Sequence, residues 1–281
     1  MAENNHKMDA IYHHILENLY KTRGIDFSGY RNSFVIKQIE KRIADLGMND
    51  PNTYRFFLEN TISEYDHLID TILINVSCFF RDPIVFEIIS QDILQNILER
   101  NSYLGSKEIR IWSAGCANGE EAYSLAILIA EVLKNEDNKW EPYIFATDIS
   151  NDALQKAEMG MYSRDKLEHI KLGFLDKYFD STATGFKISQ KIKEMVIFSN
   201  DNLVSYETFA PKDSIFGEFD LILCRNVMIY FSLVLQERIL TKLYKAIKHK
   251  GYLVLGNCES LSSSMKNQLM SVNSKHRIYQ K

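Results

Sequence analysis

The sequence predicts an α/β protein in which a small all-helical domain precedes a doubly wound, Rossmann-like sheet. Three observations support this fold class. Apolar residues recur with helical spacing up to about Asn75. From Glu108 onward, short apolar runs alternate with helical segments. The run Ile109–Ser124, with the sequence IRIWSAGCANGEEAYS, ends in small residues and glycines and then opens directly into a helix, as in nucleoside-binding α/β proteins.

The composition is that of an ordinary globular protein of 281 residues, with 46% hydrophobic and 25% charged residues. A net charge of −4 argues against broad nucleic-acid binding. No apolar run reaches membrane-spanning length, so no membrane insertion is expected, and the polar start Met1–Lys7 is not a signal peptide. The four cysteines lie far apart without a CxxC pair, which predicts no metal, no disulfide framework and a cytoplasmic location.

The helical part contains four predicted helices and is followed by a fifth, longer one. The first four are Met8–Tyr20, which ends near Gly24, Phe34–Leu46, which stops at Gly47, Asn52–Leu58 and Tyr65–Ile74. Asp82 and Pro83 resemble an N-cap and a first helical proline, and start a helix that runs to about Arg100. The predicted domains are therefore a helical domain over 1–80, a linker helix over 81–107 and a sheet domain over 108–281.

The predicted strands are short apolar runs: Ile109–Trp112, Tyr143–Thr147, Met195–Phe198, Asp220–Cys224, Tyr252–Gly256 and Arg277–Gln280. The polar stretch Ser181–Lys193 interrupts their alternation with helices. Its alternating apolar residues favour a small inserted β-hairpin, and a long surface loop is the alternative.

A candidate nucleoside site follows from the glycine turn and one acid. Gly115 and Gly119 lie in the turn before a helix, and the next apolar run stops on Asp148. In such folds the turn lets the backbone approach the ligand, while the acid takes ribose hydroxyls. The glycines alone are weak support, because many strand–turn–helix units need one.

Two further segments carry polar groups whose role the spacing leaves open. Arg225, Asn226 and Tyr230 follow a buried strand, at the end where α/β sheets bind ligands. Arg225 could equally form a structural ion pair, and Tyr230 could equally be a half-buried core ring. The segment Asn75–Asp82 could be a hydrophobic staple with a cap, or could place Asn75, Ser77 and Arg81 over the cofactor pocket.

Three acidic or nucleophilic residues are not expected to act as a nucleophile or an acid/base pair, although one of the two acids could touch a ligand. Cys224 ends a buried strand with no histidine nearby in sequence, which favours a packing role over a nucleophile. Glu120 and Glu121 are adjacent helical residues that point about 100° apart, so a paired acid/base role is not expected. Acids in a first helical turn are also favoured by the helix dipole.

A basic run lies in the helical part. Between Lys21 and Arg42 there are six cations against two acids, Asp26 and Glu40. The cations are Lys21, Arg23, Arg31, Lys37, Lys41 and Arg42. The run is either a solvated face or a docking surface for an acidic partner.

Taken together and in order, the segments resemble the chemotaxis-receptor glutamate methyltransferases, the CheR family. The matching segments are NVSCFFRDP, IRIWSAGCANGEEAYS, FATDIS with ALQKAEMGMY, the Asn202-Leu203 pair, DLILCRNVMIYF and GYLVLGNCES, which run from Asn75 to Ser260. Tyr30–Gly47 also resembles the family's basic N-terminal helix. CRNVMIYF and FFRDP are specific, whereas the glycine turn is shared with many cofactor folds.

The resemblance implies S-adenosylmethionine as methyl donor, S-adenosylhomocysteine as product and glutamates of methyl-accepting chemotaxis receptors as acceptors. The residues implied to line the cofactor site are Asn75, Ser77, Arg81, Gly115, Glu121, Asp148, Asn202, Leu203, Arg225 and Asn226. Asp148 would bind the ribose, and Arg81 and Tyr230 would lie nearest the transferring methyl group. Lys41 and Arg42 would dock the receptor's helical region. A cytoplasmic monomer without a catalytic triad or metal is expected.

The chain departs from the family pattern at several positions. Ala117, Asn118 and Ala122 replace the usual Ser, Thr and Pro, and Asn257-Cys258 replaces the usual His-Ser. The receptor-tether hairpin of the family would correspond to about Ser181–Lys193. Three alternatives remain open at this stage: a non-catalytic cofactor-sensing module, a methyltransferase acting on nucleic acid or small molecules, and an NAD-dependent dehydrogenase.

Overall fold

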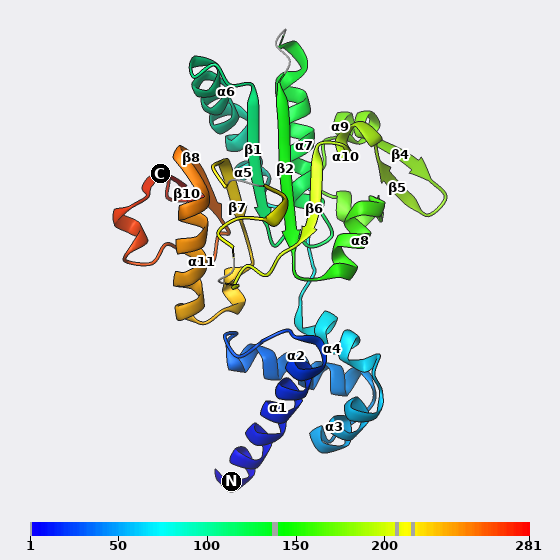
Figure 1. The fold of residues 1–281 in the computed structure, drawn as a ribbon. Helices are drawn as coiled ribbons and strands as arrows, with labels where there is room; N and C mark the ends of the chain where they lie inside the picture. Colours follow the sequence, from blue (N-terminus) through cyan, green and yellow to red (C-terminus); the bar gives the residue numbers. More distant parts are fainter. Residues whose placement is uncertain (1, 137–139, 206–207, 215–216) are drawn as a thin grey trace. The chain divides into compact units, whose positions relative to one another are not determined.

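The computed structural model describes residues 2–136, 140–205, 208–214 and 217–281, apart from the side chains of residues 2–9 and 135. The chain forms two compact units (Figure 1). The first takes in residues 1–75 together with 230–236, and the second takes in residues 76–229 and 237–281. The return of 230–236 to the first unit was not predicted from the sequence.

The described part of residues 1–75 forms four helices: α1 (Ala2–Arg23), α2 (Asn32–Asp45), α3 (Pro51–Asn60) and α4 (Glu64–Ile72). All four predicted helices are confirmed. Gly24 and Gly47 follow α1 and α2 with φ angles of +73° and +70°, the left-handed conformation that ends a helix. The carboxylate of Asp50 caps α3 by accepting from the backbone N–H groups of Asn52 and Thr53.

The segment 230–236 joins the first unit through backbone hydrogen bonds. The N–H of Arg31 donates to the carbonyl of Tyr230 at 2.9 Å, and Tyr30 forms a β-bridge with Phe231. A Cβ atom on Gly29 would lie 2.2 Å from Leu235 Cδ1. A larger residue at this position would force the side chain of Leu235 to move.

The second unit begins with an almost continuous helix. It consists of α5 (Pro83–Ile88), the π-helical turn η1 (Ile89–Ile93) and α6 (Leu94–Tyr103). The helix predicted from Pro83 is confirmed, although the π turn was not foreseen. Its apolar side chains are buried in the main hydrophobic cluster, so the segment expected to link the domains belongs to the core of the second unit.

Among the described residues, seven strands form the main sheet in the order β6-β2-β1-β7-β8-β10-β9. They are β1 (Glu108–Ala114), β2 (Glu141–Asp148), β6 (Val196–Asn200), β7 (Phe219–Cys224), β8 (Ile247–Leu255), β9 (Met270–Asn273) and β10 (Ile278–Gln280). Strands β6, β2, β1, β7 and β8 pair in parallel, whereas β10 is antiparallel to β8 and β9. The six predicted strands are confirmed, and β9, a short and mostly exposed edge strand, was missed.

Helices cover both faces of this sheet, which confirms the doubly wound architecture. On one face, Ile109 and Ile111 of β1 pack with α5, α6, α7 (Glu120–Val132) and α8 (Asn151–Met159) in one cluster. The other face carries the rings of Trp112, Phe145 and Phe219, with ring centroids 5.5 and 5.7 Å apart. The buried residues of α11 (Leu233–Ala246) lie outside the first cluster.

A small antiparallel sheet with the order β3-β5-β4 is inserted after α8. Its strands are β3 (Met161–Tyr162), β4 (Phe179–Thr182) and β5 (Gly185–Ile188), and α9 (Leu172–Tyr178) and α10 (Gln190–Lys193) flank the hairpin. The predicted hairpin is confirmed, so the surface-loop alternative fails. The hairpin starts earlier than predicted and ends in a helix.

Short 3₁₀ segments complete the connections: η2 (Leu133–Asn135), η3 (Arg164–Leu167), η4 (Lys212–Ser214), η5 (Met228–Tyr230) and η6 (Met265–Asn267). Within the ranges that the structure describes, no helix has the length and apolar character needed to span a membrane.

Asp220 fastens the amino end of β7 to its surroundings. Its side chain is fully buried and accepts from Arg100, from Asn101 at 3.3 Å and from Lys248 at 3.1 Å. The backbone N–H of Arg110 donates to its second oxygen at 2.7 Å. This network holds α6, β1 and β8 at the end of the sheet opposite to the carboxyl ends of the parallel strands.

Candidate cofactor site

The glycine turn lies at the carboxyl end of β1, directly before α7. Gly115 and Gly119 have φ angles of +77° and +86°, and Ala117 between them has a φ angle of +48°. The N–H groups of Gly115 and Cys116 both donate to the carbonyl of Thr147, at 2.8 and 2.9 Å. The turn is therefore tied to the end of β2.

The structure gives a different explanation from the predicted one for the glycines at positions 115 and 119. A Cβ atom on Gly115 would lie 2.4 Å from Val227 Cγ2, and one on Gly119 would lie 2.8 Å from Ala157 Cβ. The expected reason was close approach of the ligand to the backbone. In the structure, protein side chains already fill the space beside both α-carbons, so the glycines allow close packing of the turn.

Asp148 ends β2 beside this turn. Its Oδ2 accepts from Ala117 N–H at 2.9 Å, and its Oδ1 accepts from Ser150 N–H at 3.0 Å. Burial raises the pKa of the carboxyl, while the hydrogen bonds from Ser150 and Ala117 oppose this rise. Each carboxylate oxygen has a second lone pair, so both could still accept from a ligand.

Arg225 links three parts of the site. Its side chain, only 2% exposed, lies at the end of β7 and forms ion pairs with Glu121 at 3.2 Å and Asp82 at 2.6 Å. The same guanidinium donates to the carbonyl of Arg81 at 3.0 Å, and Ser113 donates to Glu121 at 2.8 Å. The structural ion pair is therefore real, and it lies at the ligand-binding end of the sheet.

The segment that carries Ser77 and Arg81 has an unusual backbone. Phe80 and Asp82 have φ angles of +52° and +62°, which are uncommon for residues other than glycine. Phe80 N–H donates to Ser124 Oγ at 3.0 Å, while the Nζ of Lys166 donates to the carbonyl of Ser77 at 3.0 Å. Contacts from α7 and η3 thus hold the segment in this conformation.

The expected side-chain cap at Asp82 was wrong. Asp82 is left-handed and makes no side-chain capping bond to α5, although Pro83 does occupy the first helical turn. Its carboxylate binds Arg225 instead. The ion pair with a nearly buried guanidinium takes the place of a bond to the helix N-terminus.

Asn202 and Leu203 follow β6 at the same end of the sheet, and both are half-buried. The side chain of Asn202 accepts from Val204 N–H at 3.1 Å. Lys242 of α11, itself buried, binds Asp201 at 3.2 Å and donates to the carbonyl of Asn202 at 3.4 Å. Lys242 was not singled out from the sequence, although a lysine among apolar helix positions was a usable signal.

Glu259 is a second residue of this region that was not selected from the sequence. It follows β8 and accepts four backbone N–H groups, including those of Asn226 and Val227. Burial raises the pKa of Glu259, and these hydrogen bonds oppose the rise. An acid shortly after an apolar strand resembles the position of Asp148 at the end of β2, and that signal could have identified Glu259.

The two acids at the start of α7 have separate environments, as expected. Glu121 binds Ser113 and Arg225, whereas Glu120 is fully buried. Within the described residues, neither oxygen of the Glu120 carboxyl has a hydrogen-bond partner. Burial raises the pKa of this carboxyl.

Replacing Glu120 by glutamine is expected to stabilise the protein at neutral and alkaline pH. Because the folded pKa exceeds the unfolded one, the folded state binds more protons between the two values, and stability falls as pH rises through this window. We expect Glu120→Gln to raise the free energy of unfolding by about 1–3 kcal/mol at about pH 8. Urea denaturation at several pH values measures this. A gain that is equally large below the unfolded pKa would contradict the explanation.

The remaining predicted residues lie in the first unit. Asn75 ends the stretch after α4, and the ring of Tyr230 packs against Phe34 with centroids 4.7 Å apart. That Asn75 and Tyr230 contact a cofactor held by the second unit stays a prediction. Arg42 donates two hydrogen bonds of 2.7 Å to Glu64, which is 2% exposed, while Lys41 is exposed.

Cys224, at the end of β7, is fully buried, and burial raises its thiol pKa well above the ordinary value. A neutral, inaccessible thiol is a poor nucleophile. The packing role favoured by the sequence fits this environment.

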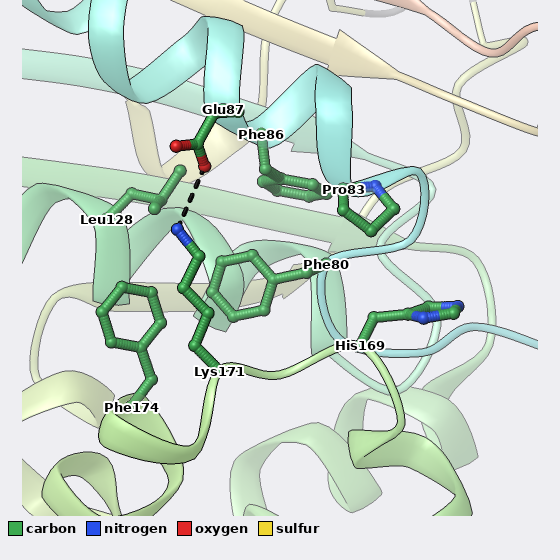
Figure 2. A pocket seen from close by; sticks show the side chains of 8 residues that line it. All are labelled: Phe80, Pro83, Phe86, Glu87, Leu128, His169, Lys171 and Phe174. Carbon is green, nitrogen blue, oxygen red and sulfur yellow. Dashed lines mark hydrogen bonds and ion pairs between the residues drawn. The ribbon is translucent and has the colours of Figure 1, made fainter.

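A small, mainly apolar pocket lies beside the ring of Phe80 (Figure 2). It is lined by Phe80, Pro83, Phe86, Glu87, Leu128, His169, Lys171 and Phe174. The ion pair between Glu87 and Lys171, 3.1 Å long, crosses it. The space in which the centre of a water molecule fits is only about 40 Å³, enough for a few waters. It is therefore too small for a nucleoside.

Two family models match the chain. The model described as "CheR methyltransferase, all-alpha domain" matches residues 10–73, and the one described as "CheR methyltransferase, SAM binding domain" matches residues 75–278. The second match contains the glycine turn, Asp148 and Arg225.

Curated relatives match over nearly the same range. The chemotaxis protein methyltransferase of Salmonella typhimurium is 31% identical over 91% of this chain and 85% of that protein. That of Escherichia coli is 30% identical over 93% of this chain and 88% of that protein. An uncharacterized 104.1 kDa protein of Rhodobacter capsulatus is 31% identical over 95% of this chain, which spans 27% of that longer protein.

Proposed function

Because this chain belongs to the CheR methyltransferase family, it is an S-adenosylmethionine-dependent methyltransferase, and we propose that it esterifies glutamate side chains of chemoreceptors. The products would be glutamyl methyl esters and S-adenosylhomocysteine. Relatives of similar length named chemotaxis protein methyltransferase support this substrate. The single observation that carries the proposal is the match of both family domains, in order, to the two parts of the chain.

The residues present fit S-adenosylmethionine on two observations. Asp148 ends the strand next to the glycine turn with hydrogen-bonding capacity left on both carboxylate oxygens, as a ribose diol requires. Arg225 has a buried Nε without a hydrogen-bond partner in the described part of the chain. We propose that these residues, with Ser77, Arg81, Gly115, Glu121, Asn202, Leu203 and Asn226, hold the cofactor, and that Asn75 completes the set.

The proposed reaction needs no general base or nucleophile from the protein's side chains. When bound, the cofactor supplies a sulfonium methyl group. A substrate glutamate is already an anion near neutral pH, so it can attack without a general base. The protein's part is to orient the reactants and exclude water, and proximity alone can supply about 7–11 kcal/mol of a barrier.

Two residues are proposed next to the transferring methyl group. The side chain of Arg81 is half-buried and, within the described residues, donates one long bond, 3.4 Å, to the carbonyl of Val76. Its remaining N–H groups could orient an incoming carboxylate. Tyr230 is proposed as the second group, on the family resemblance.

The proposed setting is the cytoplasm, with the chain acting as a monomer. All four cysteines in the sequence, Cys78, Cys116, Cys224 and Cys258, are free thiols in the structure. Free thiols fit a reducing compartment. We propose that the acceptor glutamates of the receptors also lie in the cytoplasm.

The test is methyl transfer from labelled S-adenosylmethionine to receptor-containing membranes by the purified protein. Base-labile label on receptor bands is expected. No transfer to any receptor, with S-adenosylhomocysteine still bound, would favour a non-catalytic cofactor-sensing module. Binding of NAD in place of S-adenosylhomocysteine would overturn the cofactor as well.

We propose the exposed face of α2 as the receptor-docking surface. Lys37 and Lys41 lie one helical turn apart, are exposed, and form no ion pair within the described residues. Arg42 is held by Glu64, and Arg23 by Asp66. Of the six cations in the basic run, these two lysines are best placed to meet acidic helices.

Reversing both charges, in Lys37→Glu with Lys41→Glu, is expected to lower receptor methylation about tenfold or more at low salt, because docking loses electrostatic steering. Affinity for S-adenosylhomocysteine should not change. Lys266→Glu, an exposed lysine of the second unit, is the control. Arg42→Glu is unsuitable, since it would leave Glu64 buried without its cation. If Lys266→Glu lowers receptor methylation as much as the double variant does, α2 is not a specific docking surface.

A further inference from the structure

The carboxylate of Glu259 is the centre of a clamp at the carboxyl end of β8. Oε2 accepts from Gly256 N–H at 2.6 Å and from Asn226 N–H at 3.0 Å. Oε1 accepts from Val227 N–H at 2.9 Å and from Met228 N–H at 2.7 Å. The residue is 4% exposed, so water does not replace these bonds easily.

The clamped backbone has N–H groups that need an acceptor from outside the turn. Asn226 has a φ angle of +60°, and it connects β7 to the short helix η5. The first N–H groups of a helix have no acceptor within the helix itself. Glu259 supplies that acceptor from a different strand end, and the charge of a carboxylate strengthens each bond.

Gly256 lets the carboxylate come this close. A Cβ atom there would lie 2.7 Å from Glu259 Oε2 and 2.8 Å from Asn226 N. By contrast, Asn257 and Cys258 are exposed. The two positions at which this chain departs from the family's His-Ser pair therefore contribute no side chain to the clamp.

The clamp also reaches the glycine turn. Val227, whose N–H binds Glu259, packs so closely on Gly115 that a Cβ atom at Gly115 would lie 2.4 Å from Val227 Cγ2. Arg225, immediately before the clamped turn, binds Glu121 at the start of α7. A movement of Asn226–Met228 would therefore shift both the glycine turn and the Arg225 network.

We propose that Glu259 is a positioning residue of the cofactor site: by holding Asn226–Met228, it sets Asn226, Arg225 and Gly115 in their cofactor-binding arrangement. The proposal rests on the assigned cofactor and not on the proposed receptor substrate. Binding of S-adenosylhomocysteine therefore tests it even where no receptor is methylated.

The experiment compares Glu259→Gln with Asp220→Asn. Both carboxylates are buried and accept from several donors, but Asp220 lies at the opposite end of β7 from the site. Thermal unfolding and calorimetric titration with S-adenosylhomocysteine are measured for both, below their melting transitions. Glu259→Gln replaces one acceptor oxygen by a donor that faces two N–H groups. We expect its affinity to fall about tenfold, while Asp220→Asn loses stability and keeps its affinity.

Two results would overturn the proposal. One is an affinity of Glu259→Gln within twofold of the wild type. The other is that Asp220→Asn, at the same loss of melting temperature as Glu259→Gln, loses as much affinity for S-adenosylhomocysteine as Glu259→Gln does. If Glu259→Gln fails to fold, Gly256→Ala takes its place, because the added Cβ would displace the Glu259 carboxylate and the Asn226 N–H. Its affinity and melting temperature are then compared with those of Asp220→Asn in the same way. In the wild-type protein, the amide protons of Asn226, Val227 and Met228 should have the low-field chemical shifts of strong hydrogen bonds, and in Glu259→Gln those that face the new amide nitrogen should lose this shift.

Discussion

Replacing Arg225 by methionine is expected to lower the free energy of unfolding by about 3–5 kcal/mol, the usual cost of removing one partner from a buried ion pair. The guanidinium is 2% exposed and contacts two carboxylates. Among the described residues, Glu121, at 13% exposure, would keep Ser113 as its side-chain partner, and the carbonyl of Arg81 would lose the bond from Arg225. Urea denaturation of the purified variant measures the loss.

A double-mutant cycle shows whether the stranded charge is the cause. Adding Glu121→Gln to Arg225→Met should restore part of the lost stability, because the uncompensated carboxylate is gone. Arg225→Lys should be intermediate, since one ammonium cannot span three acceptors as a planar guanidinium does. Strictly additive losses in the cycle would show that Arg225 acts through packing on Phe86, 5.5 Å from its guanidinium carbon, and not through charge.

Local sequence patterns sufficed to predict most of the fold. Alternation of apolar runs with helical segments located β1, β2, β6, β7, β8 and β10, and Gly24 and Gly47 marked helix ends. The strand β9 escaped because its four residues are mostly exposed and pack little. The π turn Ile89–Ile93 escaped because it keeps the apolar spacing of an ordinary helix.

Roles that depend on partners distant in sequence could not be predicted in the same way. Arg225 was open between ligand contact and ion pair, because its partners Asp82 and Glu121 lie more than a hundred residues away. For the same reason Asp82 resembled a helix cap, and Gly115 resembled a ligand contact although Val227 fills the space beside it. A local pattern reports that a polar group needs a partner, but only the fold supplies the partner's identity.

Asp148→Asn is expected to weaken binding of S-adenosylhomocysteine about 100-fold and to lower methyl transfer at limiting cofactor to the same extent. Two hydrogen bonds from a ribose diol to a charged acceptor contribute about 1.5–3 kcal/mol each, and 1.4 kcal/mol corresponds to a tenfold change in affinity. Asparagine keeps one acceptor oxygen and turns the other position into a donor. That donor would face the N–H of either Ala117 or Ser150, which now donate to the two oxygens of Asp148 at 2.9 and 3.0 Å, and it could no longer accept from the ribose.

Ser150→Ala is the matched control for Asp148→Asn. Ser150 is two residues away and caps α8 by accepting from Ala153 N–H at 3.2 Å, so its loss should cost about 1 kcal/mol of stability. Its side chain forms no hydrogen bond to the glycine turn within the described residues. Calorimetry should therefore show wild-type affinity for Ser150→Ala and a large loss for Asp148→Asn. If both variants bind alike, Asp148 serves only to hold the turn at Ala117, and the ribose must be bound by another group.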